Sequence, residues 1–410
     1  MTTLETFRRP IEQQLSTTLD FLRQMVEINS WTRNPSGVNQ LARFTAQVFA
    51  PLGFTAEFVQ SADPGQGQHL FLIRNGSGDG PTVGLISHLD TVFPPEEEYR
   101  NNFRWQVEGQ RIYGPGTEDI KGGTALLWLM LCGLKEGVPD LFDQTRWVIC
   151  LNAAEEELSP EFGPLSLIRL GSKARAALVF EAEGRREGFS RLVRARKGRG
   201  TFRIEALGRS AHAGVDHHRG ANAIAQLAHA LLQAEALTDP SKQLTVNVGR
   251  IEGGGGLNRV PHQAIADGEF RVFNSAYYAE ARASLLNLSG PGQILSVADG
   301  FHCQLNVQIT GETAPWPPNA ATDELLNHWI ATGSEVGLKI EGEERGGLSD
   351  GNHLWAALPT LDGLGPAGGN SHCSERTADG SKLPEFVDAS SFAPKALLNS
   401  MALLRLLQPG

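Results

Sequence analysis

The chain has 410 residues and a formal net charge of −10, with 40% hydrophobic and 20% charged residues. This length is sufficient for two domains, and the composition is ordinary for a globular protein. The acidic balance argues against a nucleic-acid partner, which would require a basic face, but local arginines could still hold an anionic small substrate.

The N-terminal segment and the cysteines bear on the cellular compartment. Residues 1–28 have the pattern of an amphipathic helix with charges throughout, and they lack the basic-then-apolar order of a signal peptide. The most apolar stretch, residues 124–134, is too short to cross a bilayer. The four cysteines are scattered and form no CxxC pair. We therefore expect a cytoplasmic protein with no membrane contact and no disulfide framework.

In chain order, the first part of the sequence alternates helices with buried strands. Helices are expected over 5–28 and 122–137, and strands over 81–90, 145–157 and 176–184. This alternation is typical of an α/β domain with a mostly parallel sheet. Such sheets bind ligands beyond the carboxyl ends of their strands, and all three expected strands carry acidic or histidine residues at that end.

The pattern changes near residue 197. The expected elements are, in order, a strand (199–208), a helix (221–237), two strands (244–254 and 263–274), a helix (277–288) and a strand (301–310). This β-α-β-β-α-β order is that of a ferredoxin-like unit, which has the size of one small domain. We therefore expect a catalytic domain made of residues 1–196 and 314–410, closed by a helix over 390–407, with an inserted domain over 197–313.

Acidic and histidine residues gather at the expected strand ends and in two loops. The candidates are His88, Asp90, Asp119, Glu155, Glu156, Glu181 and His372. Two Zn²⁺ ions about 3.5–4 Å apart need one bridging carboxylate, and each also takes an imidazole and a further carboxylate. One aspartate, two histidines and two glutamates supply that set. The remaining aspartate and glutamate are then available to orient a ligand and to act as a general base.

The spacing of these residues fits such a site. His88 and Asp90 are two positions apart, so on an extended strand both side chains project to the same face. A carboxylate on the far ring nitrogen fixes the tautomer of a metal-binding histidine. The simpler alternatives are a polar turn after the strand and, for the glutamates of NAAEEE, a solvated charge patch.

Five motifs occur in a fixed order: HLDTV, YGPGTEDIKGG, NAAEEE, VFEAE and GNSHCSE. Together they resemble the zinc-dependent carboxypeptidase and deacylase family, which includes glutamate carboxypeptidase, acetylornithine deacetylase, succinyl-diaminopimelate desuccinylase and aminoacylase. The GPG form of the second motif is most similar to the glutamate carboxypeptidase branch. The resemblance covers nearly the whole chain and implies that the inserted domain is a lid and dimerisation domain.

The resemblance implies which residues bind each zinc ion. His88 and Glu181 would bind one ion, and Glu156 and His372 would bind the other. Asp119 would bridge the two ions. Either ion is replaceable by Co²⁺ or Mn²⁺ with these ligands.

The resemblance also implies the residues that act on the substrate. Asp90 would orient the histidine of HLDTV, and Glu155 would be the general base. In the inserted domain, His212 would stabilise the oxyanion from the partner subunit. Asn258 and Arg271 would hold the carboxylate end of the substrate.

Two assignments have close alternatives in the sequence. NAAEEE has three glutamates where the family has two, so a one-residue slip would make Glu156 the base and Glu157 the ligand. The register of the preceding strand favours Glu155 as base and Glu156 as ligand. Glu183, two positions after Glu181, could share the same face.

We therefore expect a homodimeric di-zinc hydrolase that cleaves an amide bond next to a free carboxylate, as a glutamate-carboxypeptidase-like exopeptidase acting on small peptides. An N-acyl amino acid deacylase is the alternative with the same mechanism. A non-catalytic metal-binding protein of the same fold is the alternative from another class. A nucleotide-binding α/β enzyme is disfavoured because the segment GPGTEDIKGG lacks a GxGxxG pattern.

Overall fold

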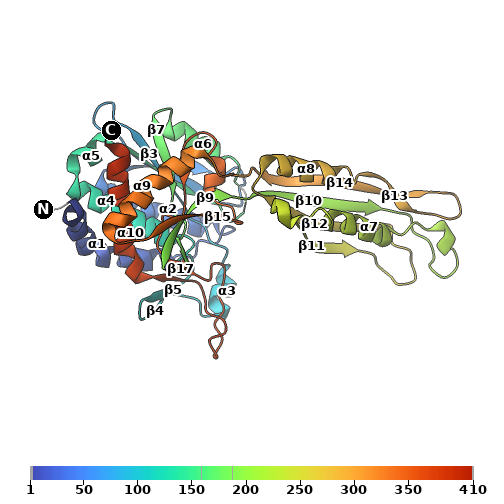
Figure 1. Cartoon of the computed structure of the whole chain (residues 1–410). Coiled ribbons are helices and arrows are strands. Elements are labelled where there is room, and N and C mark those ends of the chain that lie inside the picture. Colours follow the sequence, from blue (N-terminus) through green and yellow to red (C-terminus); the bar gives the residue numbers. More distant parts are fainter. Residues whose placement is uncertain (1–2, 158, 187, 409–410) are drawn as a thin grey trace. The chain divides into compact units, whose positions relative to one another are not determined.

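A computed structural model of the chain describes residues 3–157, 159–186 and 188–408 (Figure 1). Its residues form two compact units. Unit 1 comprises Met1–Arg194, Pro318–Glu344 and Ser349–Gly410, and unit 2 comprises Ala195–Pro317 and Arg345–Leu348. Within the described residues, no helix combines the length and apolarity that a membrane span requires.

The main sheet of unit 1 has the strand order β1-β2-β6-β3-β7-β16. Its strands are β1 (Thr55–Gln60), β2 (Gln68–Arg74), β3 (Thr82–His88), β6 (Arg146–Asn152), β7 (Ala174–Val179) and β16 (Thr360–Leu361). The pairs β3–β6, β3–β7 and β7–β16 are parallel, while β2 runs antiparallel to β1 and β6. The mostly parallel sheet was predicted; the antiparallel strands β1 and β2 were not.

Both faces of this sheet are buried. Along β6, Trp147 and Ile149 join one hydrophobic core while Val148 and Cys150 join another, as expected where successive side chains point to opposite faces. Strands buried on both faces read as continuous apolar runs, which is why they were visible in the sequence. The first core is covered by α1 (Thr3–Val26), α2 (Pro35–Phe49), α4 (Lys121–Gly137), α9 (Ala320–Val336) and α10 (Phe392–Leu407), and the second by α6 (Phe162–Leu170).

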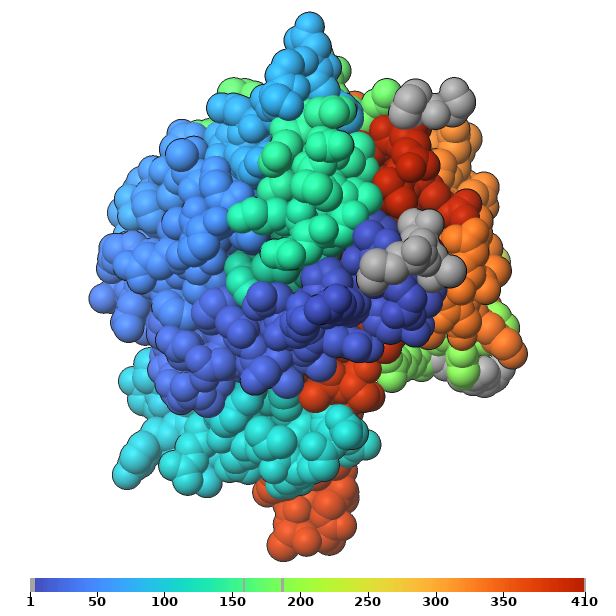
Figure 2. Space-filling model, turned by 90° about the vertical axis from the view of Figure 1, so that its left-hand side faces the viewer, coloured from blue at the N-terminus to red at the C-terminus, as the bar shows by residue number. Residues whose placement is uncertain are grey.

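Helix α4 is the most buried element of unit 1. Every residue from Lys121 to Leu134 is buried, which is typical of a helix that is apolar on all sides. α1 and α10 pack against α4 and against each other, and the two lie side by side in the space-filling view, in dark blue and red (Figure 2). The predicted buried helix is thus confirmed, and it begins two residues after the candidate ligand Asp119.

Two small sheets and two short helices complete unit 1. One sheet has the order β17-β18-β5-β4, and the other has the order β15-β9-β8. Their strands are β4 (Gln106–Glu108), β5 (Arg111–Tyr113), β8 (Gly184–Arg186), β9 (Phe189–Arg196), β15 (Ile340–Arg345), β17 (Gly368–Gly369) and β18 (Phe386–Asp388), and the helices are α3 (Pro95–Arg100) and α5 (Pro139–Gln144).

Unit 2 is an antiparallel sheet with two helices. Its strand order is β11-β12-β10-β14-β13. Alternate residues of β10, among them Phe202 and Ile204, enter one core together with side chains of both helices. The elements are β10 (Gly198–Leu207), α7 (Ala223–Glu235), β11 (Thr245–Gly253), β12 (Gln263–Val272), α8 (Ser275–Leu286), β13 (Gly290–Leu295) and β14 (His302–Thr313).

The inserted ferredoxin-like unit was predicted with one strand too few. The structure contains the expected six elements in order and adds β13 between α8 and β14. β13 begins Gly-Pro-Gly, and its pairing with β14 shifts register between Pro291 and Leu295. Glycine and proline are depleted in strands and confined largely to edges, so this edge strand carried no sequence signal.

Candidate metal centre

The candidate residues of unit 1 lie beyond the carboxyl ends of three adjacent parallel strands. His88 is the last residue of β3, Glu156 follows the end of β6, and Glu181 follows the end of β7. Asp119 comes from the loop that precedes α4, and His372 from the loop after β17. This is the position where open α/β sheets bind ligands.

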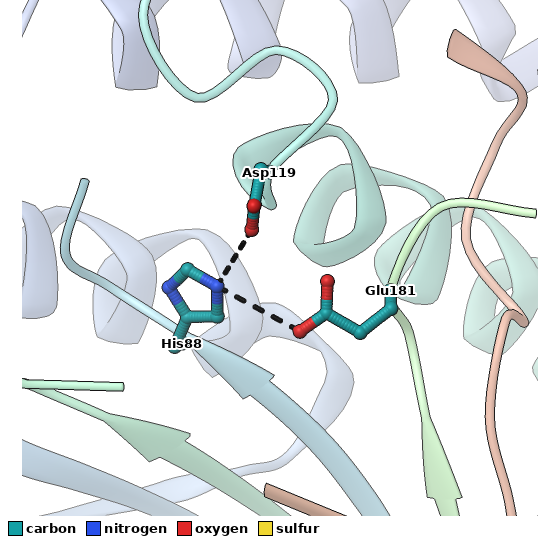
Figure 3. Close-up of side chains that lie close together, drawn as sticks. All are labelled: His88, Asp119 and Glu181. Atoms are coloured by element: carbon teal, nitrogen blue, oxygen red, sulfur yellow. Dashed lines mark hydrogen bonds and ion pairs between the residues drawn. The ribbon is translucent and has the colours of Figure 1, made fainter. Parts of the chain in front are cut away.

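His88, Asp119 and Glu181 form the first site (Figure 3). The Nε2 atom of His88 lies 2.9 Å from Oδ1 of Asp119 and 3.8 Å from Oε1 of Glu181. One candidate ligand atom from each residue lies within 4.8 Å of the others. Three side chains from three separate segments therefore point to one position.

Asp119, Glu156 and His372 form the second site. The Nε2 atom of His372 lies 3.3 Å from Oδ2 of Asp119 and 3.2 Å from Oε2 of Glu156. These atoms also lie within 4.8 Å of one another. Asp119 thus directs Oδ1 toward the histidine of the first site and Oδ2 toward the histidine of the second.

The donor atoms fit two divalent cations. Each site offers one imidazole nitrogen and carboxylate oxygens from two residues, which are the ligands that zinc and similar ions take in catalytic sites. The carboxylate shared between the sites has the arrangement needed to bridge two ions.

The electrostatics of the cluster also favour cations. Hydrogen bonds to Asp119 and Glu156 raise the pKa of His372 to about 11. Burial and the charge of Asp119 raise the pKa of Glu156 to about 7 and that of Glu181 well above its ordinary value. Closely spaced carboxylates with little surrounding water stabilise a positive charge placed among them. A divalent ion supplies more positive charge than a proton does.

Asp90 contacts His88 on the side away from the cluster. The Nδ1 atom of His88 lies 3.0 Å from the main-chain oxygen of Asp90 and 3.3 Å from its Oδ1. Both partners are acceptors, so Nδ1 carries the hydrogen and the Nε2 lone pair faces the first site. Asp90 lies just after β3 rather than within it, so the expected same-face projection along a strand is replaced by a turn in the chain.

The carboxylate of Asp90 also holds the segment after β6. It accepts hydrogen bonds from the main-chain N–H groups of Glu155 (3.0 Å) and Glu156 (3.2 Å). The hydroxyl of Thr32 donates to its Oδ2 at 2.7 Å. Thr32 was missed in the sequence, because a threonine before a helix has many ordinary explanations.

The three consecutive glutamates have different partners. Glu156 faces His372, whereas Glu157 is paired with Arg33. Burial raises the pKa of Glu155 well above its ordinary value; the charge of His88 opposes this shift, and neighbouring carboxylates add to it. The geometry therefore puts the second glutamate in the second site and the third glutamate outside both.

Glu183 is likewise held away from the first site. Its carboxylate accepts hydrogen bonds from Lys395 (2.7 Å), Arg185 (2.7 Å) and Ser190. Glu181, the preferred candidate in the sequence, is the one that faces His88.

His372 adopts an unusual backbone conformation. Its φ is +63°, in the left-handed region that non-glycine residues rarely adopt, and Asn370 has the same φ. Strained residues of this kind cluster at functional sites, where surrounding contacts hold them. Ser371, between them, donates a hydrogen bond to Glu118 of the Asp119 loop.

In unit 2, His212 and Asn258 lie on adjacent loops. Ala213 N–H donates to the main-chain oxygen of Asn258 at 2.9 Å. Nδ1 of His212 accepts hydrogen bonds from the N–H groups of Gly214 (3.2 Å) and Val215 (3.1 Å). The exposed His212 ring therefore carries its hydrogen on Nε2 and can donate it outward.

Arg271 is far from those two residues within unit 2. It is the ninth residue of β12, which begins at Gln263, so at about 3.3 Å per residue it lies about 26 Å from the end near Asn258. Its guanidinium forms a two-bond pair with Glu269, at 2.8 and 3.0 Å. The structure thus brings His212 and Asn258 together, but not Arg271 with them.

Comparisons with known proteins agree with this arrangement. The family model described as a peptidase dimerisation domain matches residues 194–287. Carboxypeptidase G2 of Pseudomonas sp. (strain RS-16) is 28% identical over 93% of this chain and 87% of that protein. Succinyl-diaminopimelate desuccinylase of Leptothrix cholodnii is 25% identical over 87% of this chain and 92% of that protein.

Solved structures share the fold over nearly the whole chain. A tripeptidase of Staphylococcus aureus has a TM-score of 0.76 at 19% identity, covering 96% of this chain and 99% of that one. The metallo-carboxypeptidase Sso-CP2 of Sulfolobus solfataricus has a TM-score of 0.69 at 15% identity, covering 95% and 99%. The dinuclear metal-binding peptidase YXEP of Bacillus subtilis has a TM-score of 0.61 at 13% identity, covering 97% and 99%.

The fold, the two clusters that share an aspartate and these relatives define a metal-dependent hydrolase of peptide or amide bonds. In sequence and fold the chain resembles the M20 peptidase family, through its likeness to carboxypeptidase G2, succinyl-diaminopimelate desuccinylase and acetylornithine deacetylase. This is a family with dinuclear metal sites.

Proposed function

We propose that this protein is a di-zinc exopeptidase of the glutamate carboxypeptidase type, which removes a C-terminal acidic residue from small peptides. His88 and Glu181 would bind one zinc, Glu156 and His372 the other, and Asp119 both. The protein would act as a cytoplasmic homodimer.

One observation carries this proposal: the two oxygens of Asp119 face two different histidines, 2.9 Å from His88 and 3.3 Å from His372. A carboxylate in that position serves no evident purpose in a simple polar turn or a solvated charge patch. It is the arrangement that a bridged pair of metal ions requires.

Bound in these positions, the ions would polarise the scissile carbonyl and make the attacking water more acidic. The protein's own side chains supply the proton transfers. Glu155, partly buried beside Glu156, would take a proton from the water and deliver it to the leaving amine. Asp90 would keep the hydrogen of His88 on Nδ1, so that Nε2 stays available.

Substrate contacts in unit 2 would come from two subunits. His212 and Asn258 lie at one end of the sheet and Arg271 near the other, so one copy of unit 2 cannot close all three around a single small substrate. This separation favours a dimer in which one subunit supplies His212 and Asn258 and the other supplies Arg271. Arg271 would exchange its pairing with Glu269 for a two-bond contact with the substrate carboxylate.

The carboxypeptidase assignment draws support from the 28% identity to carboxypeptidase G2 over 93% of this chain. Desuccinylase and deacetylase relatives at 25–26% identity support the alternative, an N-acyl amino acid deacylase. The two activities share the same metal and base chemistry and differ in the acyl group.

A substrate panel separates the two activities. Zinc-loaded protein would be assayed for amino-acid release from dipeptides ending in glutamate, and for acetate or succinate release from N-acetyl and N-succinyl amino acids. We expect the highest kcat/KM on the glutamyl-terminated peptides. Faster release of acetate or succinate would favour the deacylase. A fully metallated protein that hydrolyses none of these substrates would contradict both activities.

Metal removal tests the cofactor. A chelator should abolish activity, and Zn²⁺, Co²⁺ or Mn²⁺ added back should restore it to different degrees, because these ligands accept all three ions. Full activity after verified removal of all metal would contradict the proposal.

A further inference from the structure

Glu385 is a buried carboxylate beside the candidate metal centre. It is 0% exposed and lies just before β18. Its Oε1 accepts hydrogen bonds from the main-chain N–H groups of Glu118 (3.0 Å) and Asp119 (3.3 Å). It touches the main chain of the shared aspartate while its own oxygens stay out of both candidate sites.

The main chain of Glu385 contacts a second ligand-bearing loop. Its N–H donates to the main-chain oxygen of Cys373, the neighbour of His372, at 2.7 Å. Its own oxygen accepts from Gly114 N–H at 3.4 Å, at the start of the loop that leads to Asp119. One residue therefore bonds to two of the three segments that build the second site.

Glu385 is itself fixed by a strand pair. The next residue, Phe386, pairs with Tyr113 in the antiparallel contact between β18 and β5. β5 leads directly into the Asp119 loop. The β18–β5 pair and the side chain of Glu385 therefore fix the position of that loop together. The arrangement gives Glu385 a rigid base from which to position the loops.

The carboxylate of Glu385 is costly for the fold. Its second oxygen, Oε2, has no hydrogen-bond partner among the residues that the structure describes. An unsatisfied buried polar atom destabilises the folded state, so its presence calls for a reason other than stability. Lys121 is close enough to interact with it electrostatically, but its Nζ donates to the main-chain oxygen of Ile28 at 3.1 Å.

We propose that Glu385 is a positioning residue whose carboxylate holds the Asp119 loop, and with it the aspartate that both metal sites share. This inference rests on the proposed metal centre. The carboxylate bonds only the Asp119 loop, because the contact with the His372 loop is made by the main-chain N–H of Glu385. Asp119 belongs to both sites, so loss of the carboxylate should weaken both.

The test is a titration of metal-stripped protein with Zn²⁺ by calorimetry, and with Co²⁺ followed by its visible absorption. We expect two binding steps in wild type. Glu385→Ala should weaken both steps by about tenfold or more, the usual effect of removing a residue that supports a ligand. Glu385→Gln should be close to wild type, because its amide oxygen can still accept both N–H groups.

A matched control is available in the adjoining strand β18. Asp388 accepts a main-chain N–H from Ser390 at 3.0 Å, and among the described residues no hydrogen bond joins it to the loops of Asp119 or His372. Asp388→Ala should leave both binding steps unchanged. Glu385→Asp keeps the charge but is one methylene shorter, so it should resemble Glu385→Ala, and it replaces that variant if circular dichroism shows that Glu385→Ala does not fold.

Two results would overturn the inference. One is wild-type affinity for both ions in the folded alanine or aspartate variant, and the other is a glutamine variant as weak as the alanine one. If wild type bound no metal ion, the metal centre itself would be refuted. Failure of the positioning role alone would leave metal binding to wild type intact.

Discussion

At the scale of single residues, the segment after β6 shows how three identical side chains acquire three environments. Glu155 is partly buried and donates its N–H to Asp90, Glu156 faces His372, and Glu157 pairs with Arg33. In the sequence only the register of the preceding strand favoured Glu155 as base and Glu156 as ligand, because consecutive glutamates have the same chemistry. The ion pair of Glu157 with Arg33 is what distinguishes the two registers.

The first prediction concerns the proposed base. Glu155→Gln should bind the same amount of metal as wild type but lose about 10²–10⁴-fold in kcat, the range that general acid–base catalysis contributes. Glu157→Gln, the matched neighbour, should retain wild-type kcat within a small factor. Steady-state kinetics with elemental analysis of both variants checks this, and the reverse pattern would mean that the register is shifted by one residue.

At the scale of elements, a buried ion pair fixes α10 to the segment that carries Glu181. Lys395 of α10 and Glu183 are 2% and 7% exposed, and they lie 2.7 Å apart. A buried pair of this kind adds little stability as a whole, but a charge left without its partner is expensive. Glu181 is two residues away, so this contact also limits where that side chain can lie.

Lys395→Met removes the buried cation but leaves Glu183 bonded to Arg185 and Ser190, so it should lower the free energy of unfolding by about 1.5–3 kcal/mol. The exposed pair between Lys382 and Glu375 offers a control, since Lys382→Met should leave the free energy of unfolding close to that of wild type. Urea unfolding with unchanged m-values measures both. Equal effects of the two substitutions would contradict the assignment of a buried, essential partner to Glu183.

A buried histidine on β2 (His69) and a partly buried one at the end of the 3-10 helix Asp350–His353 make stability depend on pH. Burial lowers the pKa of His69 and His353, while Glu161 opposes the shift in both. Below pH 6.5, the ordinary value, the unfolded chain then binds more protons than the folded one, so folding stability falls as the pH falls.

His353→Leu should remove one of these contributions. Between pH 7 and pH 5 the melting temperature of the variant should fall less than that of wild type, because leucine takes up no proton. The comparison uses the difference between the two proteins at each pH, which cancels the effect of pH on metal binding. Parallel loss in both proteins would contradict a neutral His353 in the folded state.

At the scale of the whole molecule, the proposed dimer makes a prediction that a monomer does not. A mixed dimer of His212→Ala and Glu155→Gln subunits would contain one site with an intact base and an intact histidine supplied by the partner. Each variant alone should be inactive or nearly so. Unfolding and refolding a 1:1 mixture should restore about a quarter of the wild-type activity, the fraction of intact sites in a random two-subunit assembly. No recovery despite verified exchange of subunits would contradict donation of His212 between subunits.

The fold was largely predictable because its strands are buried on both faces and its helices are strongly periodic. α4 was found from its apolar run, and five further elements of unit 2 beside β10 were found from their spacing. The edge strand β13 was missed because Gly-Pro-Gly has no strand propensity. The antiparallel β1 was missed because its side chains are mostly exposed.

The candidate ligands were predictable because polar residues at the ends of apolar strands stand out. The residues that hold these ligands in place were not predictable. Thr32 contacts Asp90 across 58 positions of the sequence, a pairing that only the fold creates. Glu385 left a usable clue, a lone carboxylate between Pro384 and an apolar pair, which is an unusual place for a buried acid. The cis peptide bond between Asp119 and Ile120 has no sequence signal, because the residue after it is not proline.

The most direct test of the central claim is the metal content of the protein. Zn²⁺ per chain would be measured by elemental analysis after reconstitution and gel filtration, for wild type and Asp119→Ala. A carboxylate shared by two ions predicts two zinc ions per wild-type chain, and fewer than one in the variant, because both sites lose a ligand. No zinc in wild type, or two zinc ions retained by a folded Asp119→Ala protein, would contradict the bridged metal centre.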